Sequence, residues 1–191
     1  MKNYNLLKNI CDYSLAVFLA LIAFPLYVII ALLIKITSPG PVFFKQKRVG
    51  RNAKFFYIYK FRTMCVDADQ LGGYSTQQDD KRIYPFGKFL RKTSLDELPQ
   101  LLNVLRGDMS FIGPRPDILL QKKNYTPTEW HLRCTVKPGI TGLAQVMGRS
   151  DLSPEKRKQL DLTYVNNISL SMDMKILAQT LVTILTKKGV N

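Results

Sequence analysis

The strongest pattern in the chain is one long apolar segment near its start. Residues 15–34 read LAVFLALIAFPLYVIIALLI, twenty residues without a charge, which is the length of a helix that crosses a bilayer. A core helix of such uniform composition would be unusual in a chain of 191 residues. The run is longer than the apolar core of a cleavable signal peptide, and no small-residue cleavage site follows it, so we expect it to be retained.

How this segment meets the membrane depends on its proline and its flanks. Pro25 lies in the middle of the run, where it removes a backbone hydrogen bond and bends a helix. Both flanks are basic, and no acid occurs between residues 35 and 62. Since basic residues prefer the cytoplasmic side, a bent helix that enters one leaflet and returns satisfies both flanks. An ordinary kinked transmembrane helix is the alternative, and these residues alone leave the two interpretations level.

The segment that follows predicts a β-hairpin. Aromatic and basic residues alternate in VFFKQKRVG and again in KFFYIYKFRTM, with the turn sequence GRN between them. Strong strand formers on either side of a short turn are typical of a hairpin. Residues 66–84 are polar and contain a glycine pair, so we expect a mobile loop there.

Helices are predicted for much of the remaining chain. A short helix is expected at 85–91, and apolar residues at helical spacing predict another that starts near Ser94 and stops at Gly107. The stretches SFIGPRP and VKPGITG are predicted to be rigid, turn-rich loops. Two further helices are expected at about 154–168 and at 171–188, the second with an apolar stripe.

Charge and cysteine content narrow the function. Lys and Arg outnumber Asp and Glu by 28 to 14, a net charge of +14, which indicates anionic partners: nucleic acid, phosphorylated substrates or acidic lipid headgroups. Cys11, Cys65 and Cys134 lie far apart, and His131 is the only histidine. This spacing argues against both a zinc site and a disulfide framework.

Two adjacent acids, Asp96 and Glu97, stand out in this basic chain. Ser94 and Glu97 fit a capping box, and Asp96 could itself cap the helix, so in isolation the residues favour a helix start. The same position can serve chemistry. A helix N-terminus keeps an aspartate ionised, and an ionised aspartate is the nucleophile in enzymes that form an aspartyl-phosphate. A neighbouring carboxylate can hold a divalent cation or take a proton.

Several cations could bind phosphate near this pair. Arg115 lies between two prolines, which lowers the entropy lost when it orders around a phosphate. Lys60 and Arg62 end the second aromatic run, and Arg91 and Lys92 come just before the acids. Each alone fits an ordinary surface charge, but together they favour a phosphate site. No Walker loop and no G-x-G-x-x-G occurs, so an ATPase or a Rossmann enzyme has no support.

The stretches KFRTM, SLDELPQLLNVLRGDMSFIGPRP and KPGITGLAQVMGR, in this order behind an apolar helix, resemble the bacterial sugar transferases. The likeness is to the small monotopic polyprenyl-phosphate phosphoglycosyl transferases, and it runs over nearly the whole chain. It implies an enzyme that moves a sugar 1-phosphate from a UDP-sugar to undecaprenyl phosphate and releases UMP. The reaction would occur at the cytoplasmic face of the bacterial inner membrane. It begins the assembly of a glycoconjugate such as lipopolysaccharide, capsule, exopolysaccharide or a glycoprotein glycan.

The resemblance also implies roles for individual residues. By the family pattern, Asp96 is the covalent nucleophile and a ligand of the Mg²⁺ cofactor, and Glu97 is its partner in a dyad. Four basic positions match those around the substrate phosphates: Lys60, Arg62, Arg91 and Arg115. The family breaks its re-entrant helix at a Ser-Pro pair, and here Phe24-Pro25 keeps the proline without the serine hydroxyl.

We therefore expect an α+β fold in two parts. Residues 1–36 would form a re-entrant membrane helix, and residues 37–191 a cytoplasmic catalytic domain with a small β-hairpin, several short helices and amphipathic helices at the membrane surface. The alternative function, from a different class, is a membrane-anchored basic module that binds anionic lipid or nucleic acid. The transferase would use no nucleic acid. The sugar, the oligomeric state and the residues that contact uridine or the polyprenyl chain are left open by the sequence.

Overall fold

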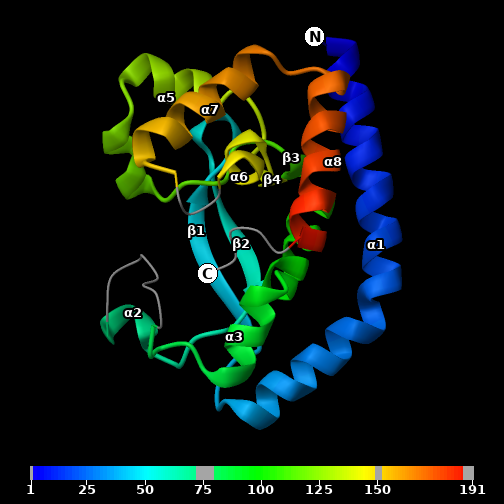
Figure 1. Cartoon of the computed structure of the whole chain (residues 1–191), viewed down its shortest axis with the longest axis vertical. Helices are drawn as coiled ribbons and strands as arrows, with labels where there is room; N and C mark the ends of the chain where they lie inside the picture. The colour runs from blue at the N-terminus through cyan, green and yellow to red at the C-terminus, as the bar shows by residue number, and fades with distance from the viewer. Residues whose placement is uncertain (1, 72–79, 149–151, 187–191) are drawn as a thin grey trace.

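The computed structural model describes residues 2–71, 80–148 and 152–186, and it has the expected α+β fold (Figure 1). A long helix runs along one side of the molecule, a β-hairpin lies at the centre, and short helices surround the hairpin (Figure 1). The elements in chain order are α1 Lys2–Thr37, β1 Phe43–Val49, the 3-10 turn η1 Arg51–Ala53, β2 Phe55–Phe61, α2 Ala68–Leu71, α3 Pro85–Lys92, the 3-10 helix η2 Leu95–Gln100, α4 Leu101–Leu105, β3 Ser110–Ile112, η3 Leu119–Asn124, α5 Pro127–Arg133, β4 Gly139–Thr141, α6 Leu143–Met147, α7 Pro154–Asn166 and α8 Leu170–Thr186.

Helix α1 has the properties of a membrane helix. Among the described residues it is the one helix long and apolar enough to cross a bilayer. Pro25 lies inside it, and Figure 1 shows the helix bending between two arms, as expected where a proline removes a backbone hydrogen bond. Ile30 and Ile34 are buried against the rest of the protein, whereas Leu21 and Ile22 are largely exposed. An apolar helix with so much exposed surface needs an apolar solvent.

The hairpin is confirmed at the predicted place. β1 and β2 are antiparallel, with a register that runs from Phe43 opposite Phe61 to Val49 opposite Phe55. Because side chains alternate between the faces of a strand, cross-strand partners share a face. On one face Phe56 and Ile58 pack with Ala16 of α1 and with residues of and after α4. The hairpin is therefore held between the membrane helix and the segment that carries the two acids.

Asn103 fastens that segment to the hairpin. The residue lies on α4 and is fully buried. Its side-chain oxygen accepts from the Tyr59 backbone N–H at 3.1 Å, and its amide nitrogen donates to the Tyr57 carbonyl at 2.7 Å. Both backbone groups belong to β2, so one amide side chain fixes the position of α4, and of η2 before it, along the strand.

The helix predicted to start near Ser94 begins differently. Ser94 has left-handed backbone angles, φ 56°, and makes no side-chain cap hydrogen bond, so the capping box is wrong. Asp96 is not a cap either, because it lies inside the six-residue 3-10 helix η2. Pro99 within η2 has no N–H to donate. The carboxylate of Glu97 does not cap the backbone at Ser94, because it is bound to Lys60 and Arg115. The stop at Gly107 agrees with the structure, since α4 ends at Leu105.

Two stretches predicted as turn-rich loops contain short strands. β3 and β4 pair in parallel, with Ser110 opposite Gly139 and Ile112 opposite Thr141. Three residues are too few to show a period-2 pattern, so the sequence carried no strand signal. The strands also come unusually close. A Cβ at Gly139 would lie 2.1 Å from the nitrogen of Gly113, so a glycine is required there.

The other helices lie where they were predicted, within the described residues. α3 and α7 cover the predicted ranges to within two residues, and α8 accounts for the last helix as far as residue 186. The polar segment 66–84 contains α2, and its residues 72–79 lie outside the described part of the chain. Leu170, Met174 and Leu181 leave α8 with exposed apolar surface, while the predicted contact of this helix with the membrane surface remains a prediction.

Helix α8 is tied to the N-terminal arm of α1, beside which it lies in Figure 1. The buried carboxylate of Asp173 accepts from the Tyr4 hydroxyl and the Lys8 ammonium at 2.5 Å each, and from the Tyr164 hydroxyl at 2.8 Å. Tyr164 is itself buried and belongs to α7. These bonds join the membrane helix to the last two helices of the soluble part.

Asn103→Ala should destabilise the protein because it leaves two β2 backbone groups without partners. We expect a loss of about 2 kcal/mol or more in the free energy of unfolding, measured by denaturant unfolding of the detergent-solubilised protein. Asn166→Ala, at an exposed position on α7, is the matched control and should change stability by less than about 0.5 kcal/mol. Equal effects of the two substitutions would contradict the role given to Asn103.

Candidate active site

The two acids meet the cations of two other segments at the surface of the hairpin. Glu97 accepts from the Lys60 ammonium at 2.6 Å and from the Arg115 guanidinium at 2.9 Å, both at the same oxygen, Oε1. Lys60 Nζ lies 3.8 Å from Oδ2 of Asp96. Glu97 thus bridges β2 and the loop after β3, and Asp96 lies next to this bridge.

The pKa values of the two carboxyl groups shift in opposite directions. Burial acts to raise the pKa of Glu97, but the charges of Arg115 and Lys60 outweigh burial and hold it well below its usual range. Burial raises the pKa of Asp96, against the opposing charge of Lys60, while the negative charge of Glu97 adds to the rise. Glu97 is therefore a fixed anion, whereas Asp96 is the carboxylate with the weaker ion pairing.

The carboxylate of Asp96 is poorly solvated and has few partners in the folded protein. Its side chain is only 11% exposed, so an ionised oxygen is poorly solvated. Among the described residues no donor makes a hydrogen bond to its carboxylate, and Lys60 is its one ion-pair partner. A further cation bound there would favour the ionised form. The lone pairs of Asp96 are thus available to an incoming electrophile or metal.

The loop that carries Arg115 is held by three separate donors. Arg133 donates to the Arg115 carbonyl at 2.6 Å, and Arg48 donates to the Pro116 carbonyl at 3.0 Å. The backbone N–H of Val49 donates to the next carbonyl, that of Asp117, at 2.9 Å. Prolines on both sides fix the backbone of Arg115 further. The predicted rigidity of Arg115 is therefore supported by contacts that the sequence did not show.

Behind this loop lies a buried network of charges. The guanidinium of Arg133 is 3.1 Å from Asp117 and 3.2 Å from Asp161, and all three side chains are at most 3% exposed. Arg157 of α7 pairs with the other oxygen of Asp117 at 2.6 Å. Removing one partner of a buried pair leaves an uncompensated charge, which is costly. The network therefore fixes α5 and α7 relative to the loop of Arg115.

The other two predicted cations lie in different surroundings. Arg91 donates from Nε to the Thr63 hydroxyl at 2.9 Å, and its charge favours the ionised form of Asp96. Arg62 is not brought to the carboxylates. Its guanidinium is buried and donates to the Pro41 carbonyl at 2.6 Å and to the hydroxyl and carbonyl of Ser38 at 2.9 and 2.7 Å.

Arg62 therefore joins the end of β2 to the chain just after α1. Each of its three nitrogens makes one of these bonds and the residue is buried, so the geometry gives it a structural role and does not support the predicted phosphate contact. Lys60 differs because it lies within β2, where its side chain reaches Glu97, whereas Arg62 follows the last residue of the strand. Of the four predicted cations, the structure brings Lys60 and Arg115 into contact with the pair and places Arg91 near it.

Two further arginines were missed by the sequence reasoning. Arg48 shares a hairpin face with Lys60. It lies opposite Phe56, and Phe56 and Lys60 are on the same face of β2 because they are an even number of residues apart. That alternation was visible in the sequence and could have identified it. Arg157 reaches the site from α7, more than forty residues beyond Arg115 in the sequence, and no local signal points to it.

The acid pair could supply part, but not all, of the ligands of a Mg²⁺ ion. The described residues contain no group of three or more metal-ligating side chains. Mg²⁺ is commonly held by one or two carboxylates together with substrate phosphates, and the free lone pairs of Asp96 fit that pattern. Glu97 is less suited, because two cations already occupy its Oε1.

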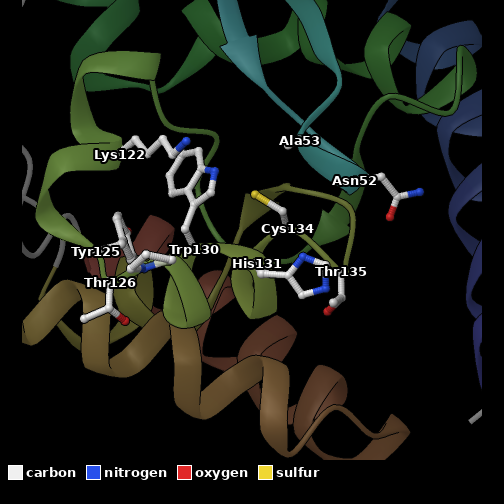
Figure 2. Close-up of a pocket in the computed structure, with 10 residues that line it drawn as sticks. Asn52, Ala53, Lys122, Tyr125, Thr126, Trp130, His131, Cys134 and Thr135 are labelled. Atoms are coloured by element: carbon white, nitrogen blue, oxygen red, sulfur yellow. The ribbon is translucent and has the colours of Figure 1, made fainter.

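A separate pocket lies at the tip of the hairpin. It has a volume of about 560 Å³ and is formed between Asn52 of η1, Lys122 of η3 and Trp130, His131 and Cys134 (Figure 2). None of the predicted site residues lines it. The carboxylate pair therefore lies outside this pocket.

Comparisons with known proteins identify the family of the chain. A family model described as bacterial sugar transferase matches residues 3–187. The uncharacterized sugar transferase EpsL of Bacillus subtilis is 42% identical over 185 residues, which are 97% of this chain and 90% of EpsL. The UDP-glucose:undecaprenyl-phosphate glucose-1-phosphate transferase of Xanthomonas campestris is 45% identical over 191 residues, 95% of this chain and 39% of that protein.

A third relative acts on a different sugar. The UDP-N-acetylgalactosamine-undecaprenyl-phosphate N-acetylgalactosaminephosphotransferase of Aeromonas hydrophila is 41% identical over 191 residues. These residues are 97% of this chain and 45% of the Aeromonas protein. The chain thus spans nearly all of EpsL but less than half of the two transferases with named substrates. Since the family model covers almost the entire sequence, the chain belongs to the bacterial sugar transferase family.

Proposed function

We propose that this protein transfers a sugar 1-phosphate from a UDP-sugar to undecaprenyl phosphate and releases UMP. The observation that carries the proposal is the weakly paired, desolvated carboxylate of Asp96 beside the Lys60–Glu97–Arg115 bridge, in a chain of this family. The named substrates of the Xanthomonas and Aeromonas relatives support a UDP-sugar donor and an undecaprenyl phosphate acceptor. Because these two relatives use different sugars, the sugar stays open.

In the first step, an oxygen of Asp96 attacks the phosphorus that carries the sugar. A new bond forms between this oxygen and phosphorus, and the phosphoanhydride bond to UMP breaks. UMP leaves with the bonding electron pair, and the phospho-sugar is bound to Asp96 as an acyl phosphate. Lys60 and Arg115 lie where they can balance the negative charge of the phosphates.

In the second step, a phosphate oxygen of undecaprenyl phosphate attacks the same phosphorus. The bond to Asp96 breaks, and the carboxylate returns with its electron pair. The product is a sugar joined to the lipid through a diphosphate, and no net proton is consumed. Glu97 acts mainly by holding Lys60 and Arg115 in place, since its pKa lies too low for it to carry a proton at neutral pH.

Mg²⁺ is proposed as the cofactor, with Asp96 and the substrate phosphates as its ligands. When bound, the metal supplies charge that neutralises the phosphates and favours the ionised form of the aspartate. The donor set supports this assignment, because Asp96 keeps free lone pairs while Glu97 is committed to two cations.

The membrane setting is also proposed. Both arms of α1 pack on the same soluble part, through Lys8 at one end and Ile34 at the other. A helix that crossed the bilayer would place these two ends on opposite sides. We propose that α1 is re-entrant, with both ends and the catalytic domain at the cytoplasmic face of the bacterial inner membrane. The basic binding module remains the alternative, but it offers no use for the Asp96 arrangement.

Asp96→Asn should abolish transfer while leaving the fold intact, because the amide is nearly isosteric but is a poor nucleophile. Radiolabelled UDP-sugar given without lipid acceptor should label the wild-type protein, and undecaprenyl phosphate should then remove the label. The variant should neither retain label nor release UMP. Asp67→Asn, at an exposed position, is the control and should behave as wild type. Full labelling of Asp96→Asn would place the nucleophile elsewhere.

Arg115→Lys should lower turnover by about tenfold or more, because lysine keeps the charge but loses the planar fork that can bind Glu97 and phosphate together. UMP release is the measurement, with membrane association as a check on integrity. Arg106→Lys makes the same chemical change at an exposed site and should leave turnover near wild type. If both variants retain normal turnover, Arg115 does not contact the phosphates.

The re-entrant topology predicts that both ends of α1 are shielded from the periplasm. In a chain with its native cysteines replaced by serine, single cysteines at the exposed positions Leu6 and Thr37 should resist a membrane-impermeant reagent in intact cells. Pro25→Ala should straighten the helix and increase labelling at one end. Strong labelling at Leu6→Cys with Pro25 present would show a spanning helix.

A further inference from the structure

Arg48 has no part in the proposed reaction beyond its contact with the loop of Arg115. Arg48 lies at the end of β1, on the same hairpin face as Lys60. One terminal nitrogen donates to the Pro116 carbonyl at 3.0 Å, and the other donates to the side chain of Gln46. Its Nε is buried without a hydrogen-bond partner. In the described residues no carboxylate oxygen lies within ion-pair distance of Arg48.

Arg48 also lies among like charges. Burial, together with the charges of Arg115 and Arg157, lowers the pKa of Arg48 to about 10, against the opposing charges of Asp117 and Glu97. The acids nearby are already committed: Glu97 pairs with Arg115, and Asp117 pairs with Arg157 and Arg133. A partly buried arginine held beside two others, with no acid of its own, leaves positive charge uncompensated. Such an arrangement is typical of a site whose counter-charge arrives with the ligand.

The three side chains belong to one region of the protein, and each is at least partly exposed. The side chain of Arg115 is 40% exposed and that of Arg157 is 26% exposed, while Arg48 is partly exposed. Arg133 and Arg157 both contact the Arg115 carbonyl, and Arg48 contacts the next carbonyl. We call Arg48, Arg115 and Arg157 the arginine cluster. It comes from β1, the loop after β3 and α7, so it forms only when these segments assemble.

We propose that the arginine cluster binds the phosphate monoester of a substrate, with Arg48 and Arg157 as binding residues beside Arg115. The inference rests on the proposed function and adds a second phosphate position to the site. Arg115 links Glu97, next to the reacting phosphorus, to Arg48 and Arg157 on its other side. In the UDP-sugar a second phosphate is joined to the reacting one, and undecaprenyl phosphate brings another. Either phosphate would lie within reach of guanidinium groups, two of which can bind one phosphate together.

Two compounds of the reaction carry this chemistry. UMP, the product of the first step, is a phosphate monoester once it leaves, and undecaprenyl phosphate, the substrate of the second step, is one before it reacts. The two occupy the enzyme in successive steps, so one site could serve either or both. Binding measurements with each compound can separate these possibilities without depending on turnover.

The test is equilibrium binding to the full-length, detergent-solubilised protein, with UMP and the short lipid analogue farnesyl phosphate as the two probes. Arg48→Gln should weaken binding of at least one probe by about tenfold or more, because a charged double donor is lost. Arg157→Gln should weaken the same probe. Lys47→Gln removes a charge from the neighbouring residue, which is exposed and lies over the Phe55 ring, and should leave both affinities unchanged.

The pattern across the two probes identifies the source of the phosphate. Weaker binding of UMP alone assigns the cluster to the nucleotide, weaker binding of farnesyl phosphate alone assigns it to the lipid, and weaker binding of both indicates a shared site. Unchanged affinity of Arg48→Gln for both probes, with an unchanged unfolding midpoint, would overturn the inference. Arg48→Lys is the control for a folding defect. It keeps the positive charge, so it should restore part of the affinity that Arg48→Gln loses.

The outcome is separable from that of the proposed function. If wild-type protein becomes labelled by a UDP-sugar while Arg48→Gln binds both probes normally, the transferase stands and the arginine cluster is wrong. If the wild type is never labelled and never releases UMP, the transferase is wrong, whereas a loss of phosphate binding in Arg48→Gln would still support the cluster.

Discussion

The site depends on one carboxylate oxygen that holds two cations from distant parts of the chain. Glu97 Oε1 binds Lys60 from the hairpin and Arg115 from the loop after β3, two residues that are 55 positions apart in the sequence. Because Glu97 is satisfied in this way, the neighbouring Asp96 is left desolvated and weakly paired. Two adjacent acids thus acquire different properties from their surroundings, one as a structural anion and one as a group free to react.

The rest of the structure keeps this bridge in place. Asn103 fixes the acid-bearing segment along β2, and Arg133 holds the loop of Arg115 from behind. Buried ion pairs such as Arg133 with Asp117 are weak evidence for stability, because removing charges from water is costly. Their value here is geometric, since they fix where Arg115 can lie. The apolar helix α1 adds a further constraint, because Ala16, Ile30 and Ile34 pack in clusters with residues of the hairpin.

The sequence was most informative where a pattern is long or a motif is local. The apolar run, the hairpin and the last two helices could be predicted because each repeats over many residues, and Lys60, Arg115 and the acid pair could be predicted from motifs. The capping box failed because the side chain of Glu97 has better partners in the folded chain than the backbone of Ser94. Strands β3 and β4 are too short for periodicity. Arg62, assigned to phosphate from its position, is bound to Ser38, and Arg157 reaches the site only through tertiary folding.

The central claim is that Asp96 carries the phospho-sugar. It is tested most directly by mass spectrometry of the intact protein after brief exposure to a UDP-sugar, followed by proteolysis to locate any adduct. The account predicts an added mass equal to one sugar phosphate less water, on the peptide that contains TSLDELPQ, with the fragment ions assigning it to Asp96. An adduct at any other residue, or UMP release with no adduct under conditions that preserve acyl phosphates, would contradict it.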